Sequence, residues 1–139
     1  PDLTIVVNGG VKSLDSAEDL LQDLDGVMIG REAYQNPWIL ARADRRIFGS
    51  AQPEPTRGDV LEGYLPFVDR ELAAGVPLGR ITRHILGLFQ GVPGARAWRR
   101  YISENAHVDG ANTRLLEDAL AHMAPAGSGS AQVHDDDLE

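Results

Sequence analysis

The sequence has 139 residues, of which 42% are hydrophobic and 24% charged, with a formal net charge of −8 and no cysteine. Such a composition is ordinary for a globular domain, and the lack of cysteine excludes disulfides and thiolate metal sites within the chain. No apolar run approaches the roughly 20 residues of a membrane-spanning helix, so we expect a cytoplasmic protein with no membrane contact and no metal.

The first predicted elements are two strands and the helix between them. Residues 3–7 form an apolar run, rich in β-branched side chains and without alternation, which is typical of a parallel strand buried on both faces. Residues 26–30 form a second such run, and residues 13–24 place their leucines on one helical face. Because two parallel strands do not make a stable sheet, we expect further strands from outside this sequence.

After Gly30 the sequence predicts helices only. Asn36 and Pro37 can begin a short helix that continues to Ile47, because proline is tolerated in a first turn. Amphipathic helices joined by short links then predict a four-helix bundle, with helices at residues 59–74, 78–90, 93–106 and 111–124. The larger aromatic side chains of this bundle are predicted to be core rather than base-stacking platforms: Tyr64, Phe89, Trp98 and Tyr101.

These elements divide the chain into four parts. Residues 1–50 combine strands and helices, residues 51–58 form a linker, and residues 59–124 form a helical domain. Residues 125–139 are rich in Gly and Ser and then acidic, so we expect a disordered tail. The predicted fold class is therefore α/β followed by all-α.

Two short motifs follow the predicted strands. Asn8-Gly9-Gly10 ends the first strand, and its glycines let backbone N–H groups approach an anion without a Cβ in the way. Gly30-Arg31 ends the second strand, where a guanidinium can bind a phosphate with two hydrogen bonds. Alone, the first motif also fits a plain tight turn and the second a surface arginine. Together they indicate a phosphate site, because the loops after the last two strands of a TIM barrel form one.

Three strings of the sequence resemble a known family. They are NGGVKS at residues 8–13, DGVMIGREAYQNP at 25–37, and TRHILGLFQGVPGARAWRRY at 82–101. Over about residues 3–124 the chain is similar to A-type tRNA-dihydrouridine synthases. The third string is the most specific, because other FMN barrels share the phosphate loops but lack this helical extension.

The resemblance implies a fold and a cofactor. It implies the last two β/α units of a TIM barrel, followed by the four-helix bundle as a tRNA-binding domain. The family holds the FMN phosphate with the Asn-Gly-Gly backbone and the Gly-Arg pair. By resemblance these roles pass to five residues of this chain: Asn8, Gly9, Gly10, Gly30 and Arg31.

The resemblance also implies an activity. The family reduces uridine to 5,6-dihydrouridine in the tRNA D-loop, at expected positions 20 and 20a, and NADPH is the reductant of its flavin. A cysteine on an upstream loop supplies the proton in the family, whereas this sequence has no cysteine. We therefore assign no catalytic residue within this chain and expect the chain alone to be inactive.

A cluster of arginines predicts contact with RNA. Arg96, Arg99 and Arg100 lie one turn apart on one predicted helix, a spacing that can follow an RNA backbone. A solvated helix face is the alternative. In the resembled family this segment contributes to tRNA recognition, so we predict a monomer that binds tRNA through Arg83 and these three arginines. Residues 77–103 contain no acid and carry a local charge of +5, from Arg80, Arg83, Arg96, Arg99 and Arg100.

Other interpretations stay open at this point. Another FMN-barrel oxidoreductase that acts on a small molecule, such as a dihydroorotate or dihydropyrimidine dehydrogenase, would explain the phosphate loops but not the basic helices. A free-standing helical RNA-binding module would explain the helices but not the strands. His84, beside Arg83, has either a hydrogen-bonding or RNA-facing role or is an ordinary surface histidine. Tyr34 and Trp38 could pack against the outer helices of the barrel.

Overall fold

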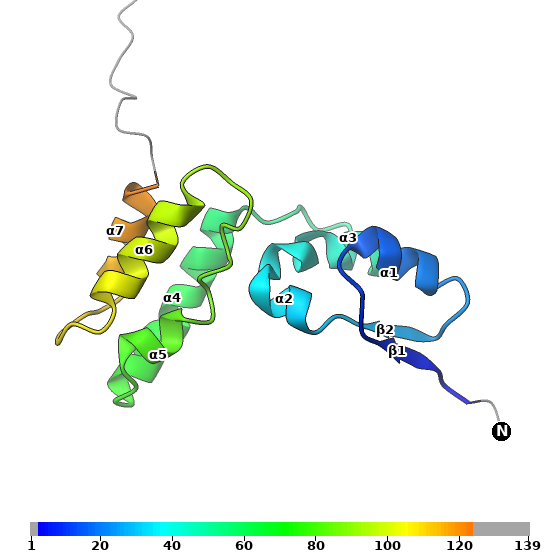
Figure 1. Cartoon of the computed structure of the whole chain (residues 1–139), viewed down its shortest axis with the longest axis horizontal. Helices are drawn as coiled ribbons and strands as arrows, with labels where there is room; N and C mark the ends of the chain where they lie inside the picture. The colour runs from blue at the N-terminus through cyan, green and yellow to red at the C-terminus, as the bar shows by residue number, and fades with distance from the viewer. Residues whose placement is uncertain (1–2, 124–139) are drawn as a thin grey trace, which may run out of the picture.

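The computed structural model describes residues 3–123 of the chain. The strands and short helices of residues 3–48 lie at one end, and the longer helices that begin at residue 57 lie at the other (Figure 1). An extended link connects the two parts. The tail expected to be disordered, residues 125–139, lies outside the described residues.

The first part begins with a strand–helix–strand unit, as predicted. Strand β1 (Val6–Asn8) pairs in parallel with β2 (Gly26–Met28), with Val7 opposite Val27. Helix α1 (Leu14–Leu20) connects the strands, and Ser13 caps it by accepting a hydrogen bond from the Ser16 backbone N–H at 3.1 Å. The paired segments cover the end of the first predicted run with the residue after it, and the first three residues of the second run.

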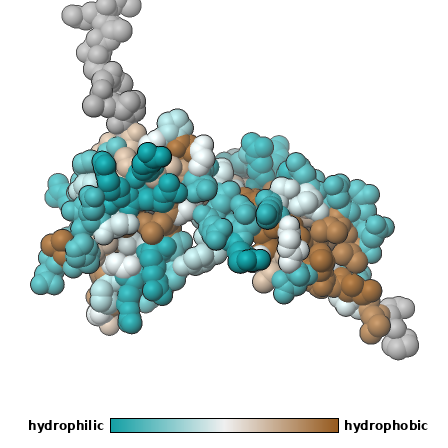
Figure 2. All heavy atoms as spheres, viewed as in Figure 1, coloured by the Kyte–Doolittle hydropathy of each residue, from teal (hydrophilic) through white to brown (hydrophobic). Residues whose placement is uncertain are grey.

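Within the described residues, the first strand is not buried. Leu3 and Ile5 are 82% and 56% exposed, and Val6 and Met28 are also exposed. Figure 2 shows the resulting apolar surface at the end of the molecule that carries the strands. Within the described residues, Leu14 and Ala17 of α1 are buried. They do not cover the exposed side chains of Leu3, Ile5, Val6 and Met28. Apolar surface of this kind usually marks a contact.

Three short helices follow β2. They are α2 (Arg31–Gln35), a 3₁₀ helix named η1 (Pro37–Arg42), and α3 (Ala43–Phe48). The predicted single helix from Asn36 to Ile47 is therefore two pieces, and α2 was not predicted at all. Pro37 opens η1, as expected for a residue that has no N–H to donate.

Arg46 attaches α3 to α1. Its guanidinium contacts both carboxylate oxygens of Glu18, with Nε donating to Oε1 at 2.9 Å, and Nη2 donates to Asp15. These hydrogen bonds raise the pKa of Arg46 above its ordinary value. The ion pairs are exposed, so they hold the orientation of the two helices more than they add stability.

The second part begins with the longest helix, α4 (Arg57–Ala73), two residues before the predicted start. Thr56 and Asp59 form a reciprocal capping box: the Asp59 backbone N–H donates to Thr56 Oγ1 at 3.1 Å, and the Thr56 N–H donates to Asp59 Oδ2 at 2.7 Å. Pro66 lies inside the helix, which continues past it to Ala73.

The predicted helix at residues 78–90 is wrong in length. Helix α5 (Leu78–Thr82) ends at Thr82, and residues 83–94 form successive turns. Hydrogen bonds three residues apart mark these turns, as from the Ile85 N–H to the Thr82 carbonyl at 3.0 Å and from the Leu88 N–H to the Ile85 carbonyl at 3.0 Å. The observed arrangement is three longer helices, the short α5 and a turn segment rather than four complete helices.

The turn segment is explained by where its residues pack. A Cβ at Gly87 would overlap the carbonyl of Gln35, so the backbone of the turn lies directly against the end of α2. Leu88 and Phe89 enter the core at the same place.

The core of the second part confirms the predicted packing of its aromatic residues. Helices α6 (Ala95–Asn105) and α7 (Arg114–Ala121) complete it. Trp98 is fully buried, its ring centroid lies 4.7 Å from that of Phe89, and its Nε1–H donates to the Ile85 carbonyl at 3.4 Å. Trp38, which could have packed against the barrel's outer helices, packs against this core.

Two further observations concern what the described part lacks. No helix within residues 3–123 is both long and apolar enough to cross a membrane. Over the same residues, no cluster of three or more His, Asp or Glu side chains could hold a metal ion.

Candidate functional site

The parallel strands bring the two predicted phosphate motifs together. β1 ends at Asn8 and β2 ends at Met28, directly opposite in the register. Their following loops therefore leave the sheet at the same edge. A cavity of about 470 Å³ opens between these loops, and all five residues predicted to hold a phosphate line it: Asn8, Gly9, Gly10, Gly30 and Arg31.

The first loop needs glycine for its backbone conformation. Gly9 has φ +122° and Gly10 has φ +75°, a region that side chains with a Cβ rarely adopt. No atom lies within 4 Å of the position that a Cβ would take at either glycine. The loop thus presents bare backbone with open space around it, which is how a loop can approach a phosphate closely.

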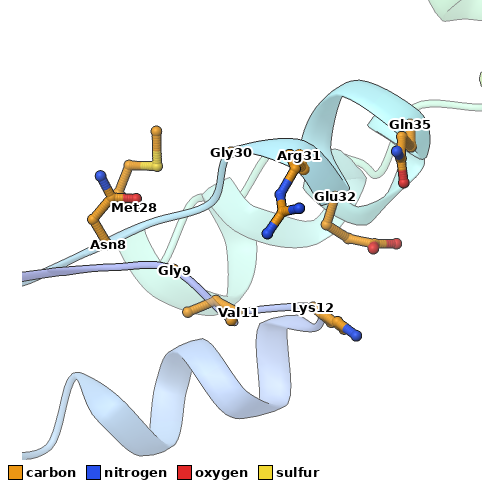
Figure 3. Close-up of a pocket in the computed structure, with 10 residues that line it drawn as sticks. Asn8, Gly9, Val11, Lys12, Met28, Gly30, Arg31, Glu32 and Gln35 are labelled. Carbon is orange, nitrogen blue, oxygen red and sulfur yellow. The ribbon is translucent and has the colours of Figure 1, made fainter.

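The second loop supplies the charge. Arg31 is the first residue of α2, and its guanidinium projects toward the segment that follows β1 (Figure 3). Arg31 is exposed, and its side chain makes no hydrogen bond or ion pair within the described residues. Its guanidinium is thus available to an anion in the cavity, with the two parallel N–H groups that a phosphate can accept from.

Three charged or polar lining residues were missed by the sequence reasoning. Lys12 and Gln35 line the cavity beside Arg31, and Glu32 adds one carboxylate. Lys12 could have been found, since it follows the glycine pair within the same loop. Glu32 and Gln35 belong to α2, which was not predicted. With two cations against one carboxylate, the lining retains a net positive charge and suits a dianionic group.

The arginines predicted to bind RNA lie in two places. Arg96, Arg99 and Arg100 occupy the exposed face of α6, opposite the buried Trp98 and Ile102. Arg99 is partly engaged, since its Nη1 donates to Gln90 Oε1 at 3.1 Å. The three side chains form one basic helix face, as their spacing predicted.

Arg83 lies outside α6, beside its C-terminal end. It is exposed just after α5 and lines a groove together with Ser103 and His107, at the far end of α6. Its Nε donates to His84 Nε2 at 3.3 Å. All four arginines are exposed on the second part of the chain.

Comparisons with known proteins cover both parts of the chain. A family model described as dihydrouridine synthase (Dus) matches residues 1–124. The chain is 60% identical over 123 residues to the tRNA-dihydrouridine(20/20a) synthase of Vibrio cholerae, which covers 88% of this chain and 38% of that protein. It is 57% identical over 124 residues to the tRNA-dihydrouridine(20/20a) synthase of Escherichia coli K12, with 89% and 36% covered. The chain thus spans little more than a third of the length of these relatives.

Proposed function

The chain belongs to the dihydrouridine synthase family, and from this premise we propose that it is the C-terminal part of an FMN-dependent tRNA-dihydrouridine synthase. The proposed reaction is the reduction of uridine to 5,6-dihydrouridine in the tRNA D-loop, at positions 20 and 20a, with NADPH as reductant. The name of the relatives at 60% and 57% identity supports this substrate. The observation that carries the proposal is the meeting of two loops at one cavity in a chain whose two parts match a single family.

The single family match also bears on the competing interpretations. A small-molecule FMN oxidoreductase would leave residues 57–121 without a role, and a free-standing RNA-binding module would leave the parallel strands without one. The match runs through both parts, from residue 1 to residue 124. We therefore retain neither alternative.

The cavity fits the phosphate of FMN. Bare backbone at Gly9 and Gly10 and the guanidinium of Arg31 are the groups that hold phosphates in proteins. We propose that these three residues, with Asn8 and Gly30, bind the FMN phosphate and that Lys12 adds charge. When bound, the flavin supplies the hydride chemistry. The residues of this chain bind and orient the cofactor; we assign no catalytic residue to them.

The exposed strands support a barrel. Leu3, Ile5, Val6 and Met28 leave apolar surface on a two-stranded sheet that is too small to be stable alone. We propose that β1 and β2 are the last two strands of a TIM barrel whose other strands cover this surface, with the phosphate loops at its carboxyl edge. Residues 1–50 are then the end of the barrel, 51–58 a linker and 59–124 the tRNA-binding domain, as the sequence predicted.

The basic face of α6 supports tRNA as the substrate. Arg96, Arg99 and Arg100 are exposed within a stretch that contains no acid, and Glu104 follows one turn after Arg100 on α6. The face keeps an excess of positive charge, so these arginines can neutralise phosphates. We propose that they and Arg83 contact the tRNA backbone while the barrel holds the target uridine. The proposed enzyme acts as a monomer in the cytoplasm.

The test is direct. The complete enzyme, purified with its flavin, is incubated anaerobically with NADPH and unmodified tRNA, and dihydrouridine at positions 20 and 20a is measured by mass spectrometry of the digested tRNA. We expect flavin bleaching by NADPH, followed by modification at these two positions. Bleaching without any dihydrouridine would contradict the proposed substrate, and a protein without flavin would contradict the proposed cofactor.

A further inference from the structure

Two residues that are 50 positions apart in the sequence meet where the first part of the chain contacts the second. The Tyr34 hydroxyl of α2 lies 3.0 Å from His84 Nδ1, and the two rings are edge to face with centroids 5.8 Å apart. The other ring nitrogen, His84 Nε2, lies 3.3 Å from Arg83 Nε. His84 thus connects Tyr34, on the helix that begins at Arg31, to Arg83.

The donor chemistry assigns the proton on His84. A guanidinium only donates, so Arg83 Nε–H donates to His84 Nε2, and this nitrogen must hold a lone pair. A neutral imidazole with an acceptor at Nε2 has its hydrogen on Nδ1, so Nδ1–H donates to the Tyr34 oxygen. The hydrogen of the Tyr34 hydroxyl is then not used by His84, and the described residues offer it no other acceptor.

The surroundings of these three side chains suit an anion from outside the protein. Tyr34 is 58% exposed, and Arg83 and His84 are exposed as well. Beyond its contact with His84, the Arg83 side chain makes no hydrogen bond or ion pair within the described residues. Residues 77–103 contribute no carboxylate. An O–H donor and a guanidinium are therefore both presented to solvent, each held by the same imidazole.

We propose that Tyr34 and Arg83 together bind the phosphodiester backbone of the RNA, and that His84 is the positioning residue that holds both. This inference rests on the proposed function, because it takes tRNA as the ligand. It adds Tyr34, a residue of the cofactor-binding part, to the RNA-contacting surface. Tyr34 follows Arg31 by one turn on α2. The proposed RNA contact therefore lies on the same helix that borders the phosphate cavity.

The first arm of the test measures tRNA binding by variants of the complete enzyme, with flavin content as a check on folding. Tyr34→Phe removes only the hydroxyl, and we expect tRNA affinity to fall about tenfold, the scale of one hydrogen bond to a charged group. Tyr101→Phe is the matched control, because Tyr101 is half-buried and its ring stacks on His122. We expect that control to bind tRNA as the wild type does.

The second arm asks whether His84 acts through its neighbours. We expect His84→Ala to weaken tRNA binding, and His84→Gln to recover part of the loss, because the glutamine amide oxygen can accept from Arg83 as Nε2 does. In a background that carries Tyr34→Phe and Arg83→Ala, His84→Ala should change the affinity no further. A further loss in that background would overturn the positioning role.

The third arm needs no RNA. The ¹⁵N shifts of the histidine ring distinguish the two neutral tautomers, and the His84 signals are identified by their loss in His84→Gln. We expect hydrogen on Nδ1; hydrogen on Nε2 would overturn the inference.

The outcomes also separate this inference from the proposed function. Wild-type tRNA affinity in Tyr34→Phe, together with weakened binding when Arg99 and Arg100 are replaced, would overturn the inference alone. If the complete enzyme did not bind tRNA at all, the proposed function itself would fail.

Discussion

The guanidinium of Arg57 lies over the ring of Trp38, with its Cζ 4.3 Å from the ring centroid. The Nε–H of the same side chain donates to the Leu88 carbonyl at 2.8 Å. One arginine at the start of α4 thus joins η1 to the turn segment at residues 83–94. Burial lowers the pKa of Arg57 below its ordinary value, yet an arginine stays charged at neutral pH and keeps its attraction to the ring.

Replacing Arg57 with Lys tests this junction. A lysine keeps the charge but lacks the planar Nε–H donor, so the hydrogen bond to Leu88 is lost and the contact with the Trp38 ring weakens. We expect the free energy of unfolding, measured by urea denaturation, to fall by about 1–2 kcal/mol. Arg70→Lys is the control, because Arg70 lies over Phe67 at 5.2 Å with its side chain 70% exposed. Equal losses in the two variants would contradict a special role for Arg57.

Replacing Arg31 with Ala tests the phosphate cavity. If Arg31 binds the FMN phosphate, the complete enzyme loses a charge-assisted contact, and its affinity for FMN should fall by about 1.5–3 kcal/mol. Fluorescence titration of the apoenzyme with FMN measures the change. Arg45→Ala removes an exposed arginine of the same part that does not line the cavity, and we expect it to bind FMN normally. Undiminished flavin retention in Arg31→Ala would refute the assignment.

Replacing Arg99 and Arg100 together with Ala tests the basic face of α6. Each phosphate contact releases counterions, so tRNA affinity should fall as salt rises. In the double variant we expect weaker binding and a slope of log affinity against log salt that is flatter by about one unit per lost contact. A variant with Arg45 and Arg114 replaced by Ala removes the same charge from elsewhere on the surface. Identical slopes for the wild type and for Arg99→Ala/Arg100→Ala would contradict the proposed phosphate contacts and show that this face is only solvated.

The capping box at the start of α4 predicts a dependence of stability on pH. Hydrogen bonds from the Thr56 backbone N–H and hydroxyl lower the pKa of Asp59 below its ordinary 3.8. A carboxylate with a lowered pKa stabilises the fold fully above its unfolded value and progressively less as the pH falls below it. We expect Asp59→Ala to lower the Tm at pH 7 and to differ less from wild type near pH 3. Asp69→Ala, an exposed change on the same helix, should show no such convergence.

Fragments of the chain test the proposed division into domains. Residues 56–124 contain the buried cluster around Trp98 and Leu116, so we expect this fragment to fold as a helical unit, less stable than in the chain because it lacks Trp38. Residues 1–50 have two short strands with exposed apolar faces, and we expect them to stay unfolded alone. Circular dichroism and thermal melts of both fragments decide the matter. A cooperative melt of a helical 1–50 fragment would count against the truncated-barrel interpretation.

The sequence by itself determined the elements whose signals are local. The apolar runs around Val7 and Val27 predicted two strands with a helix between them, and periodicity predicted α4, α6 and α7 to within a few residues. It also predicted that the two motifs after the strands form one site, because the loops after the last two strands of a TIM barrel form a phosphate site. These features depend on neighbouring residues, which a sequence shows directly.

Only the tertiary structure decided what depends on distant contacts. The apolar spacing of Ile81, Ile85 and Phe89 predicts a helix, but the segment turns where Gly87 lies against Gln35 of α2. His84 likewise reaches Tyr34, 50 residues away. Such contacts depend on where the chain folds back on itself, and no local pattern of residue types encodes that position.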